Sequence, residues 1–262
     1  MGRDVAKRRL DLLLVQRGLT ESRARAQWLI RQGRVMAAGR PCSRPGEWLP
    51  QDVPLEVSEP FPYVSRGGLK LAHALDTFDI SVAGLVALDV GASTGGFTDC
   101  LLQRGVRQVY AVEVGWGQLH PRLDNDPRLY YMAETDIRGL KTLPGEAVAD
   151  LAVVDVSFIS LRLVLPAVLR LIRPDGAIIA LVKPQFEVGP GVVNRRGVVR
   201  RRAERLRALR EVLAFAEALR LGLAGLTVAP PDQERGNVEY LACWRRGVAG
   251  MPVGEAVDLV QE

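Results

Sequence analysis

The stretch "ALDVGASTGGFTDCLL", Ala87 to Leu102, joins an apolar run to an amphipathic one through a glycine-rich loop. The apolar run is typical of a buried strand, and the segment after the loop is typical of a helix. Small residues at such a junction let backbone N–H groups approach a ligand closely, and a helix N-terminus favours a carboxylate. The stretch therefore predicts a ligand-binding loop between a strand and a helix.

The spacing of the glycines separates three kinds of ligand. Gly91 and Gly96 have the interval of a P-loop, but Phe97 stands where the phosphate-binding lysine belongs. A dinucleotide fingerprint needs glycine at position 93, which is Ser93. The third ligand, S-adenosylmethionine, needs small residues near its amino-acid end and a carboxylate farther on for its ribose. The loop alone leaves open whether it binds this ligand or is merely a tight turn.

From residue 85 onward, short apolar runs alternate with helical patterns. Alternation of this kind predicts an α/β fold with a mostly parallel seven-stranded sheet and helices on both faces. Ligands bind such sheets at the carboxyl ends of the strands. The predicted strands are 85–90, 108–114, 129–133, 150–156, 176–182, 223–229 and 239–244, and the predicted helices are about 97–105, 161–173 and 200–220.

Carboxylates follow the first three predicted strands. Asp89 ends the first strand, and Glu113 ends the second, 22 residues after Gly91, where a carboxylate suits ribose hydroxyls. Asp136 follows the third strand and is placed to accept from an adenine amino group. This combination fits S-adenosylmethionine better than a dinucleotide or an empty turn. We expect the cofactor to be bound by Asp89, Gly91, Ser93, Thr94, Gly95, Gly96, Phe97, Thr98, Glu113 and Asp136.

Composition places the chain among soluble globular proteins. Its 262 residues are 48% hydrophobic and 25% charged, enough for one large domain and a small one. The longest apolar runs, such as 176–182, are too short to span a membrane. Cys42, Cys100 and Cys243 are too few and too distant for a disulfide framework or a zinc knuckle. We therefore expect no metal site, no membrane partner and a reducing cytoplasm.

Positive charge is concentrated at the N-terminus. Residues 1–44 hold 11 Arg and Lys against three acids, whereas residues 45–262 hold 24 against 27. This excess is expected of a domain that meets a polyanion, although a solvated arginine-rich surface has the same composition. The segment 41–62 holds six of the sixteen prolines and cannot be one helix. We place a small domain at 1–58 and a large one at 59–262, with 59–66 as the linker.

The small domain has the pattern of two short helices followed by a strand and a tight turn. The second helix, in "TESRARAQWLIRQG", is predicted to begin at Thr20 and end at Gly33. Its residues Leu29 and Ile30 are predicted to face a core. Residues 8–35, containing "RLDLLLVQRGLTESRARAQWLIRQGRV", resemble the S4 RNA-binding domain. Arg23, Gln27, Arg31 and Arg34 form a basic stripe on this helix, and the residues expected to contact RNA are Arg23, Arg25, Arg31, Arg34 and Arg66.

Four further segments place a charge within or beside an apolar strand or helix. They are "VSRGGLKL" with Lys70, "LAVVDVSFISL" with Asp155, "ALVKPQFEVG" with Lys183 and "RGNVEYLAC" with Glu239. Such charges are rarely left unpaired, so one interpretation is a buried network of salt bridges. Only four of the 35 basic residues are lysines, however, and two of them lie here. Arginine serves a structural ion pair as well, whereas a general base must lose its proton near neutral pH, which only lysine can be tuned to do.

The order Lys70, Asp155, Lys183, Glu239 is similar to the K-D-K-E tetrad of FtsJ-type ribose 2′-O-methyltransferases. With the S4-like domain, "DVGASTGGFTD", "VDVSFISL", "LVKPQFE" and "GNVEY", nearly the whole chain resembles the TlyA (hemolysin A) family. The resemblance implies a Rossmann-like methyltransferase fold. It also implies methylation of a ribose 2′-hydroxyl, commonly of cytidine, in ribosomal RNA or ribosomal subunits. In this interpretation Lys183 is the candidate base, Asp155 orients it, and Glu239 positions Lys70 or the hydroxyl.

Three other functions compete with this one. A non-catalytic RNA-binding factor of ribosome assembly would not need the intact loop and tetrad. A membrane-active haemolysin, as the family's older name implies, lacks any apolar stretch of about 18 residues. A small-molecule methyltransferase would leave the basic N-terminal domain without a purpose.

Overall fold

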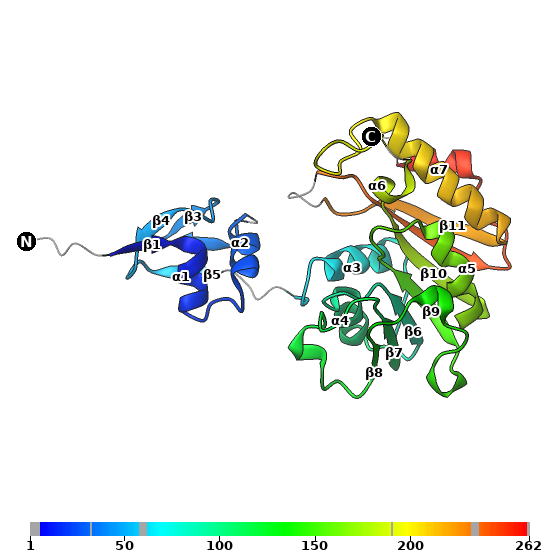
Figure 1. The fold of residues 1–262 in the computed structure, drawn as a ribbon, viewed down its shortest axis with the longest axis horizontal. Helices are drawn as coiled ribbons and strands as arrows, with labels where there is room; N and C mark the ends of the chain where they lie inside the picture. The colour runs from blue at the N-terminus through cyan, green and yellow to red at the C-terminus, as the bar shows by residue number, and fades with distance from the viewer. Residues whose placement is uncertain (1–5, 32, 58–61, 190, 232–235, 261–262) are drawn as a thin grey trace, which may run out of the picture. The chain divides into compact units, whose positions relative to one another are not determined.

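The structure is a computed structural model that describes residues 6–31, 33–57, 62–189, 191–231 and 236–260. The chain forms two compact units, Met1–Pro62 and Tyr63–Glu262 (Figure 1). The predicted boundary at Ser58 falls on residues 58–61, which lie outside the described part of the chain. Among the helices of the described ranges, none is long and apolar enough to cross a membrane.

The large unit is built on one seven-stranded sheet in the order β11-β12-β10-β9-β6-β7-β8. β12 is antiparallel to both of its neighbours, β10 and β11. The pairs formed by β10, β9, β6, β7 and β8 are all parallel. The prediction of a mostly parallel seven-stranded sheet is therefore confirmed. The strands are β6 Val86–Val90, β7 Gln108–Val112, β8 Leu129–Met132, β9 Ala149–Val154, β10 Ile172–Val182, β11 Leu221–Val228 and β12 Tyr240–Arg246.

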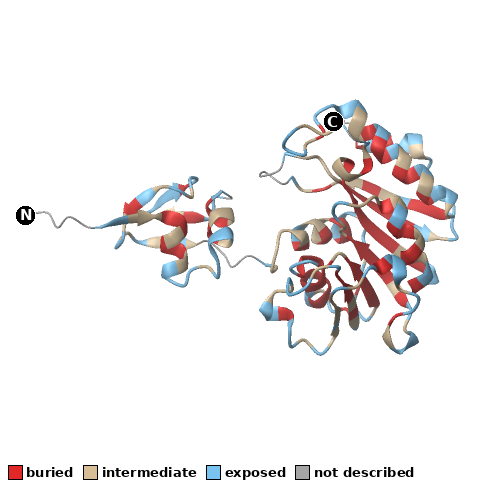
Figure 2. Cartoon of the chain, viewed as in Figure 1, coloured by how far each residue is buried: buried red, intermediate tan, exposed pale blue. Residues whose placement is uncertain are grey.

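Helices cover both faces of this sheet, which explains why its central strands are continuous apolar runs. All five residues of β6 are buried, as expected of a parallel strand between two helical layers (Figure 2). Leu88 and Val90 belong to the core cluster that includes residues of α5, α7 and α8, whereas Ala87 belongs to the cluster that includes residues of α3 and α4. The helices of this unit with more than four residues are α3 Gly67–Thr77, α4 Gly96–Gln103, α5 Leu161–Leu171, α7 Arg202–Ala218 and α8 Val253–Leu259.

The strand register brings distant parts of the sequence to one edge of the sheet. Val90 is paired with both Val112 and Val154, so β6, β7 and β9 end side by side. At the end of β10, Val182 lies opposite Tyr240, the first residue of the antiparallel β12. Residues that follow β6, β7, β9 and β10, and the residue that precedes β12, therefore lie at the same edge.

The small unit contains two short helices and two small sheets. Its strands are ordered β3-β2-β5 in one sheet and β1-β4 in the other, and Leu29 and Ile30 lie in its core as predicted. The second helix begins later than predicted: Ser22 Oγ accepts from Arg25 N at 3.2 Å, so Ser22, not Thr20, caps it. The elements are β1 Lys7–Arg9, α1 Leu10–Gln16, α2 Arg23–Arg31, β2 Val35–Ala37, β3 Arg40–Cys42, β4 Trp48–Pro50 and β5 Leu55–Val57.

Candidate active site

The glycine-rich loop after β6 is held by close backbone packing. Gly91 has a φ of +84°, and a Cβ at this position would lie 2.6 Å from the backbone oxygen of Asp155. Asp155 N in turn donates to Val90 O at 2.9 Å. Gly95 has a φ of +89° and caps α4. Only glycine lets the ends of β6 and β9 approach so closely, so the loop is a fixed cradle rather than an incidental turn.

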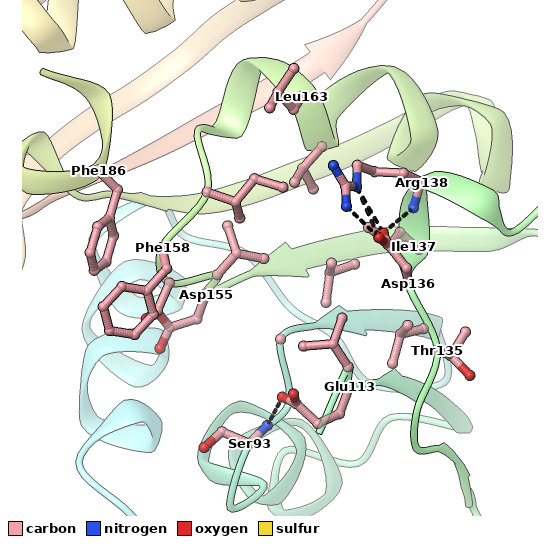
Figure 3. Close-up of a pocket in the computed structure, with 18 of the residues that line it drawn as sticks. Ser93, Glu113, Thr135, Asp136, Ile137, Arg138, Asp155, Phe158, Leu163 and Phe186 are labelled. Atoms are coloured by element: carbon pink, nitrogen blue, oxygen red, sulfur yellow. Dashed lines mark hydrogen bonds and ion pairs between the residues drawn. The ribbon is translucent and has the colours of Figure 1, made fainter. Parts of the chain in front are cut away.

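Glu113, directly after β7, fixes the loop from the side. Its Oε2 accepts from Ser93 N at 2.8 Å, and its Oε1 accepts from Gly115 N at 2.8 Å. The residue is only 7% exposed. Because a carboxylate has about four acceptor positions, both oxygens keep a free lone pair for ligand hydroxyl groups. Two backbone N–H groups thus hold Glu113, the residue predicted to bind the ribose, in one orientation. Figure 3 shows the bond from Ser93.

A cavity of about 860 Å³ opens at this edge of the sheet, within the usual range for small-molecule sites. Its lining includes Gly91, Ser93, Glu113 and Asp136 from the predicted set, together with aromatic side chains that the sequence analysis did not single out. A glycine cradle, oriented carboxylates and an adjoining apolar wall fit the amino-acid, ribose and base parts of S-adenosylmethionine. Six other predicted cofactor residues are not among those that line the cavity: Asp89, Thr94, Gly95, Gly96, Phe97 and Thr98.

Asp89 and its neighbours support the cradle from within the fold. Asp89 and Thr98 are fully buried, and Thr98 Oγ1 donates to Asp89 Oδ2 at 2.6 Å. Within the described residues Asp89 Oδ1 has no hydrogen-bond partner. Burial raises the pKa of Asp89 to about 7, and the nearby Asp155 adds to this rise. Phe97, 3% exposed, packs in the core shared by α3 and α4.

Asp136 is already engaged by a neighbouring arginine. Its two oxygens lie 3.0 Å from Arg138 Nε and 2.6 Å from Arg138 Nη2, and Oδ1 also accepts from Arg138 N. The Arg138 side chain lowers the pKa of Asp136. Both residues line the cavity (Figure 3). An adenine amino group at Asp136 would share the carboxylate with Arg138, a residue that the sequence analysis missed.

The four charged residues predicted to form a tetrad lie in two close pairs. Lys183 Nζ lies 2.6 Å from Asp155 Oδ1, and Lys70 Nζ donates to Glu239 Oε2 at 2.6 Å. All four side chains are at least three-quarters buried, with exposed fractions between 10% and 23%. Charges withdrawn from water to this extent need partners, and each lysine has an acid as its partner.

Two polar residues that the sequence analysis missed complete this cluster. Lys183 Nζ donates to Ser157 Oγ at 2.9 Å. Gln185 Nε2 donates to Glu239 Oε1 at 2.9 Å, and Gln185 lies on α6, Pro184–Glu187, which directly follows Lys183. The two ion pairs are therefore coupled through a single short segment of backbone.

Glu187 anchors that segment to the loop that carries Asp155. Its Oε1 accepts from Leu161 N at 2.8 Å, and its Oε2 accepts from Ser160 Oγ at 2.5 Å. Phe158, which lies between Asp155 and Ser160 in the chain, is 91% exposed and has a φ of +63°, and its ring lies 5.0 Å from that of Phe186. The loop is held at both ends and presents an aromatic pair on the cavity wall (Figure 3).

The predicted RNA contacts of the small unit divide into two groups. Arg23 Nε and Gln27 Nε2 donate to Asp11 Oδ2 at 3.0 and 2.8 Å, and Arg9 binds the same carboxylate. Arg9, with Gln27 and Arg23, holds the pKa of the buried Asp11 well below its usual range. Arg23 and Gln27, two of the four stripe residues, therefore also stabilise the small unit by pairing with Asp11. Of the other predicted residues, Arg31 is exposed at the end of α2, and Arg34 is exposed but lies beyond the helix, which ends two residues before the predicted Gly33. Arg25 lies 5.0 Å from the Trp28 ring centre, and Arg66 caps α3 in the large unit.

A mostly parallel sheet with one antiparallel strand, a glycine cradle after the first strand and carboxylates after the second and third define an S-adenosylmethionine-dependent methyltransferase. The FtsJ-like methyltransferase family matches residues 63–246, and the S4 domain matches residues 8–47. The chain belongs to the TlyA (hemolysin A) family of FtsJ-like methyltransferases, as its sequence predicts.

Individual relatives resemble the chain over most of their length. The 16S/23S rRNA (cytidine-2′-O)-methyltransferase TlyA of Mycobacterium tuberculosis is 44% identical, over 91% of this chain and 89% of its own. Hemolysin A of Brachyspira hyodysenteriae is 35% identical, over 89% of this chain and 98% of its own. The solved structure of a hemolysin-like protein from Streptococcus thermophilus is 37% identical, with a TM-score of 0.74, and the match covers 97% and 96% of the two chains.

Proposed function

We propose that the chain transfers a methyl group from S-adenosylmethionine to the 2′-hydroxyl of a cytidine ribose in ribosomal RNA. The observation that carries this proposal is the pair of buried lysine–carboxylate contacts, joined through Gln185, at the edge of the sheet that also holds the cofactor cavity. Asp155 belongs to both the pair and the cavity lining. The choice of cytidine and of ribosomal RNA is supported by the name of the Mycobacterium tuberculosis relative, a 16S/23S rRNA (cytidine-2′-O)-methyltransferase.

The cofactor supplies an electrophilic methyl group, so the protein must orient a hydroxyl and accept its proton. Lys183 Nζ carries three positions for hydrogen or a lone pair besides its bond to Cε. A hydrogen bond to Ser157 uses one of these positions, and Asp155 Oδ1 lies 2.6 Å from Nζ as an ion pair. In the neutral amine the lone pair is proposed to accept the proton of the substrate hydroxyl. Lys183 is the proposed general base, with Asp155 and Ser157 orienting it.

The second pair is proposed to hold the hydroxyl in place. Glu239 accepts from Lys70 and from Gln185, one on each carboxylate oxygen. Glu239 is thus oriented by Lys70 and Gln185, while Asp155 pairs with Lys183. The exposed Phe158 ring on the cavity wall offers a surface on which the target base can stack.

The basic small unit is proposed to bind the RNA, with separated ribosomal subunits or their naked RNA as the substrate and the cytoplasm as the location. Residues 1–44 hold the excess of positive charge, and the S4 match covers residues 8–47. Phosphate contacts by such residues supply affinity without sequence information.

The test is incubation of the full chain with radiolabelled S-adenosylmethionine and either each ribosomal subunit or its protein-free RNA. The RNA is then digested to nucleosides and analysed by mass spectrometry. We expect the label in 2′-O-methylcytidine, from at least one substrate. Label on a base, or no transfer to any of the four substrates, would contradict the proposal.

A further inference from the structure

The pair of strands β1 and β4 carries an exposed indole among cations. In β4, Leu49 is 8% exposed and faces the core, whereas Trp48 is 61% exposed. β1 runs antiparallel to β4, with Arg9 opposite Trp48 and Lys7 opposite Pro50. Residues directly opposite one another in an antiparallel pair project from the same face, and alternate residues of a strand share a face. Lys7, Arg9 and Trp48 therefore lie on one face.

Asp11 joins this face to the basic stripe on α2. Arg9 Nη2 and Arg23 Nε both reach Asp11 Oδ2, at 2.9 and 3.0 Å. The Asp11 side chain is fully buried and offsets one of the three positive charges of Lys7, Arg9 and Arg23, so this face keeps a net positive charge. We call Lys7, Arg9, Arg23 and Trp48 the aromatic–basic face. The positive charges of this face extend from α2 to the strand pair β1–β4.

The chemistry of this face fits single-stranded nucleic acid. Lysine and arginine bind phosphates, and an exposed indole offers a flat surface on which a base can stack. In a paired helix the bases are already stacked on one another, so a duplex cannot use the indole. Burial of Trp48 against a base would also remove apolar surface that folding leaves in water.

We propose that Trp48 stacks on an unpaired base of bound RNA, while Lys7 and Arg9 contact the adjacent phosphates. The inference rests on the proposed function, because that function makes RNA the partner of the small unit. It adds a base-binding subsite on β4, beyond residues 8–47 of the S4 match.

The test measures binding of the full chain to a fluorescently labelled RNA hairpin with an unpaired loop and to a fully paired RNA duplex. Trp48→Ala should weaken hairpin binding about 5- to 100-fold and leave duplex binding unchanged. Trp48→Phe, which keeps an aromatic ring, should retain most of the affinity. The dependence of hairpin affinity on salt should be the same for Trp48→Ala and wild type, because no phosphate contact is lost. Arg31→Glu should make this dependence shallower.

Leu259→Ala is the matched control, because Leu259 is 62% exposed but lies in the other unit. It should not change binding to either RNA. Equal hairpin affinity of wild type and Trp48→Ala would overturn the inference while leaving the proposed function intact. Equal losses on hairpin and duplex would also overturn it, because they would show a general disturbance of the unit. A wild-type chain that binds neither RNA would overturn both the inference and the RNA partner of the proposed function.

Discussion

At the scale of single residues, Asp89 shows how the sheet adjusts the charge of a side chain. It lies at the end of a fully buried strand, receives one hydrogen bond from Thr98, and has a pKa raised by burial to about 7. In the unfolded chain the same carboxyl loses its proton near pH 4. Between these two values the unfolded state has released the proton and the folded state still holds it. Asp89 therefore reduces stability as pH rises from about 4 to about 7.

Asp89→Asn should remove this dependence, because the amide cannot ionise and its oxygen still accepts from Thr98. The free energy of unfolding of the variant, relative to wild type, should rise by on the order of 3–4 kcal/mol between pH 4 and pH 7. Urea unfolding at a series of pH values measures it. Asp124→Asn, at an exposed position, is the control and should follow wild type. Parallel curves for Asp89→Asn and wild type would mean that Asp89 is ionised throughout.

Residue patterns predicted the four members of the tetrad but not the polar residues that contact them. Lysines in apolar segments of an arginine-rich chain are conspicuous, and the structure brings all four tetrad residues into two pairs. Ser157 and Gln185 lie within the same segments, yet nothing in their type distinguishes them from other polar residues. Likewise, the bond from Arg23 to Asp11 joins two helices, so the basic stripe alone could not reveal it.

At the scale of elements, the site depends on how closely the ends of β6 and β9 approach. Gly91→Ala should force these ends apart, because the added Cβ would lie 2.6 Å from the Asp155 backbone oxygen. We expect affinity for S-adenosylmethionine to fall at least about tenfold, which corresponds to roughly 1.4 kcal/mol. Titration calorimetry measures it.

Gly84→Ala is the matched control for this variant. Gly84 also has a positive φ, +76°, but a Cβ there would meet nothing within 4 Å. The Gly84→Ala variant therefore has the backbone strain of alanine at a positive φ, but its added Cβ contacts no other atom. If Gly91→Ala bound the cofactor as tightly as Gly84→Ala, the close approach of the two strands would not matter for the site.

Elements were predictable where burial dictates the sequence. Strands enclosed by helices on both faces are continuous apolar runs bounded by turns, so all seven were located within a few residues. The N-terminal part of β10 was missed because "IRPD" lacks that pattern, and its register with β9 is irregular between Ile172 and Ala177. The start of α2 was misplaced because Thr20 and Ser22 are both good caps, and only the fold selects between them.

At the scale of the whole molecule, the proposed RNA binding and the proposed chemistry belong to different units. Residues 1–44 hold the positive excess, whereas the cavity and the tetrad belong to the unit Tyr63–Glu262. Composition predicted this division, since net charge changes sign along the chain. The family match supports S-adenosylmethionine as the methyl donor, and the proposed route of the substrate proton depends on Lys183.

The most direct test of the central claim is the single-turnover rate of methyl transfer by Lys183→Arg on saturating ribosomal RNA. Arginine keeps the positive charge beside Asp155 but cannot supply a neutral nitrogen near pH 7. We predict a rate about 10²–10⁴-fold below wild type, with unchanged affinity for S-adenosylmethionine. Lys141→Arg, an exposed lysine outside the site, should keep the wild-type rate. A Lys183→Arg variant that retained more than about a tenth of that rate would contradict the assignment of Lys183 as the base.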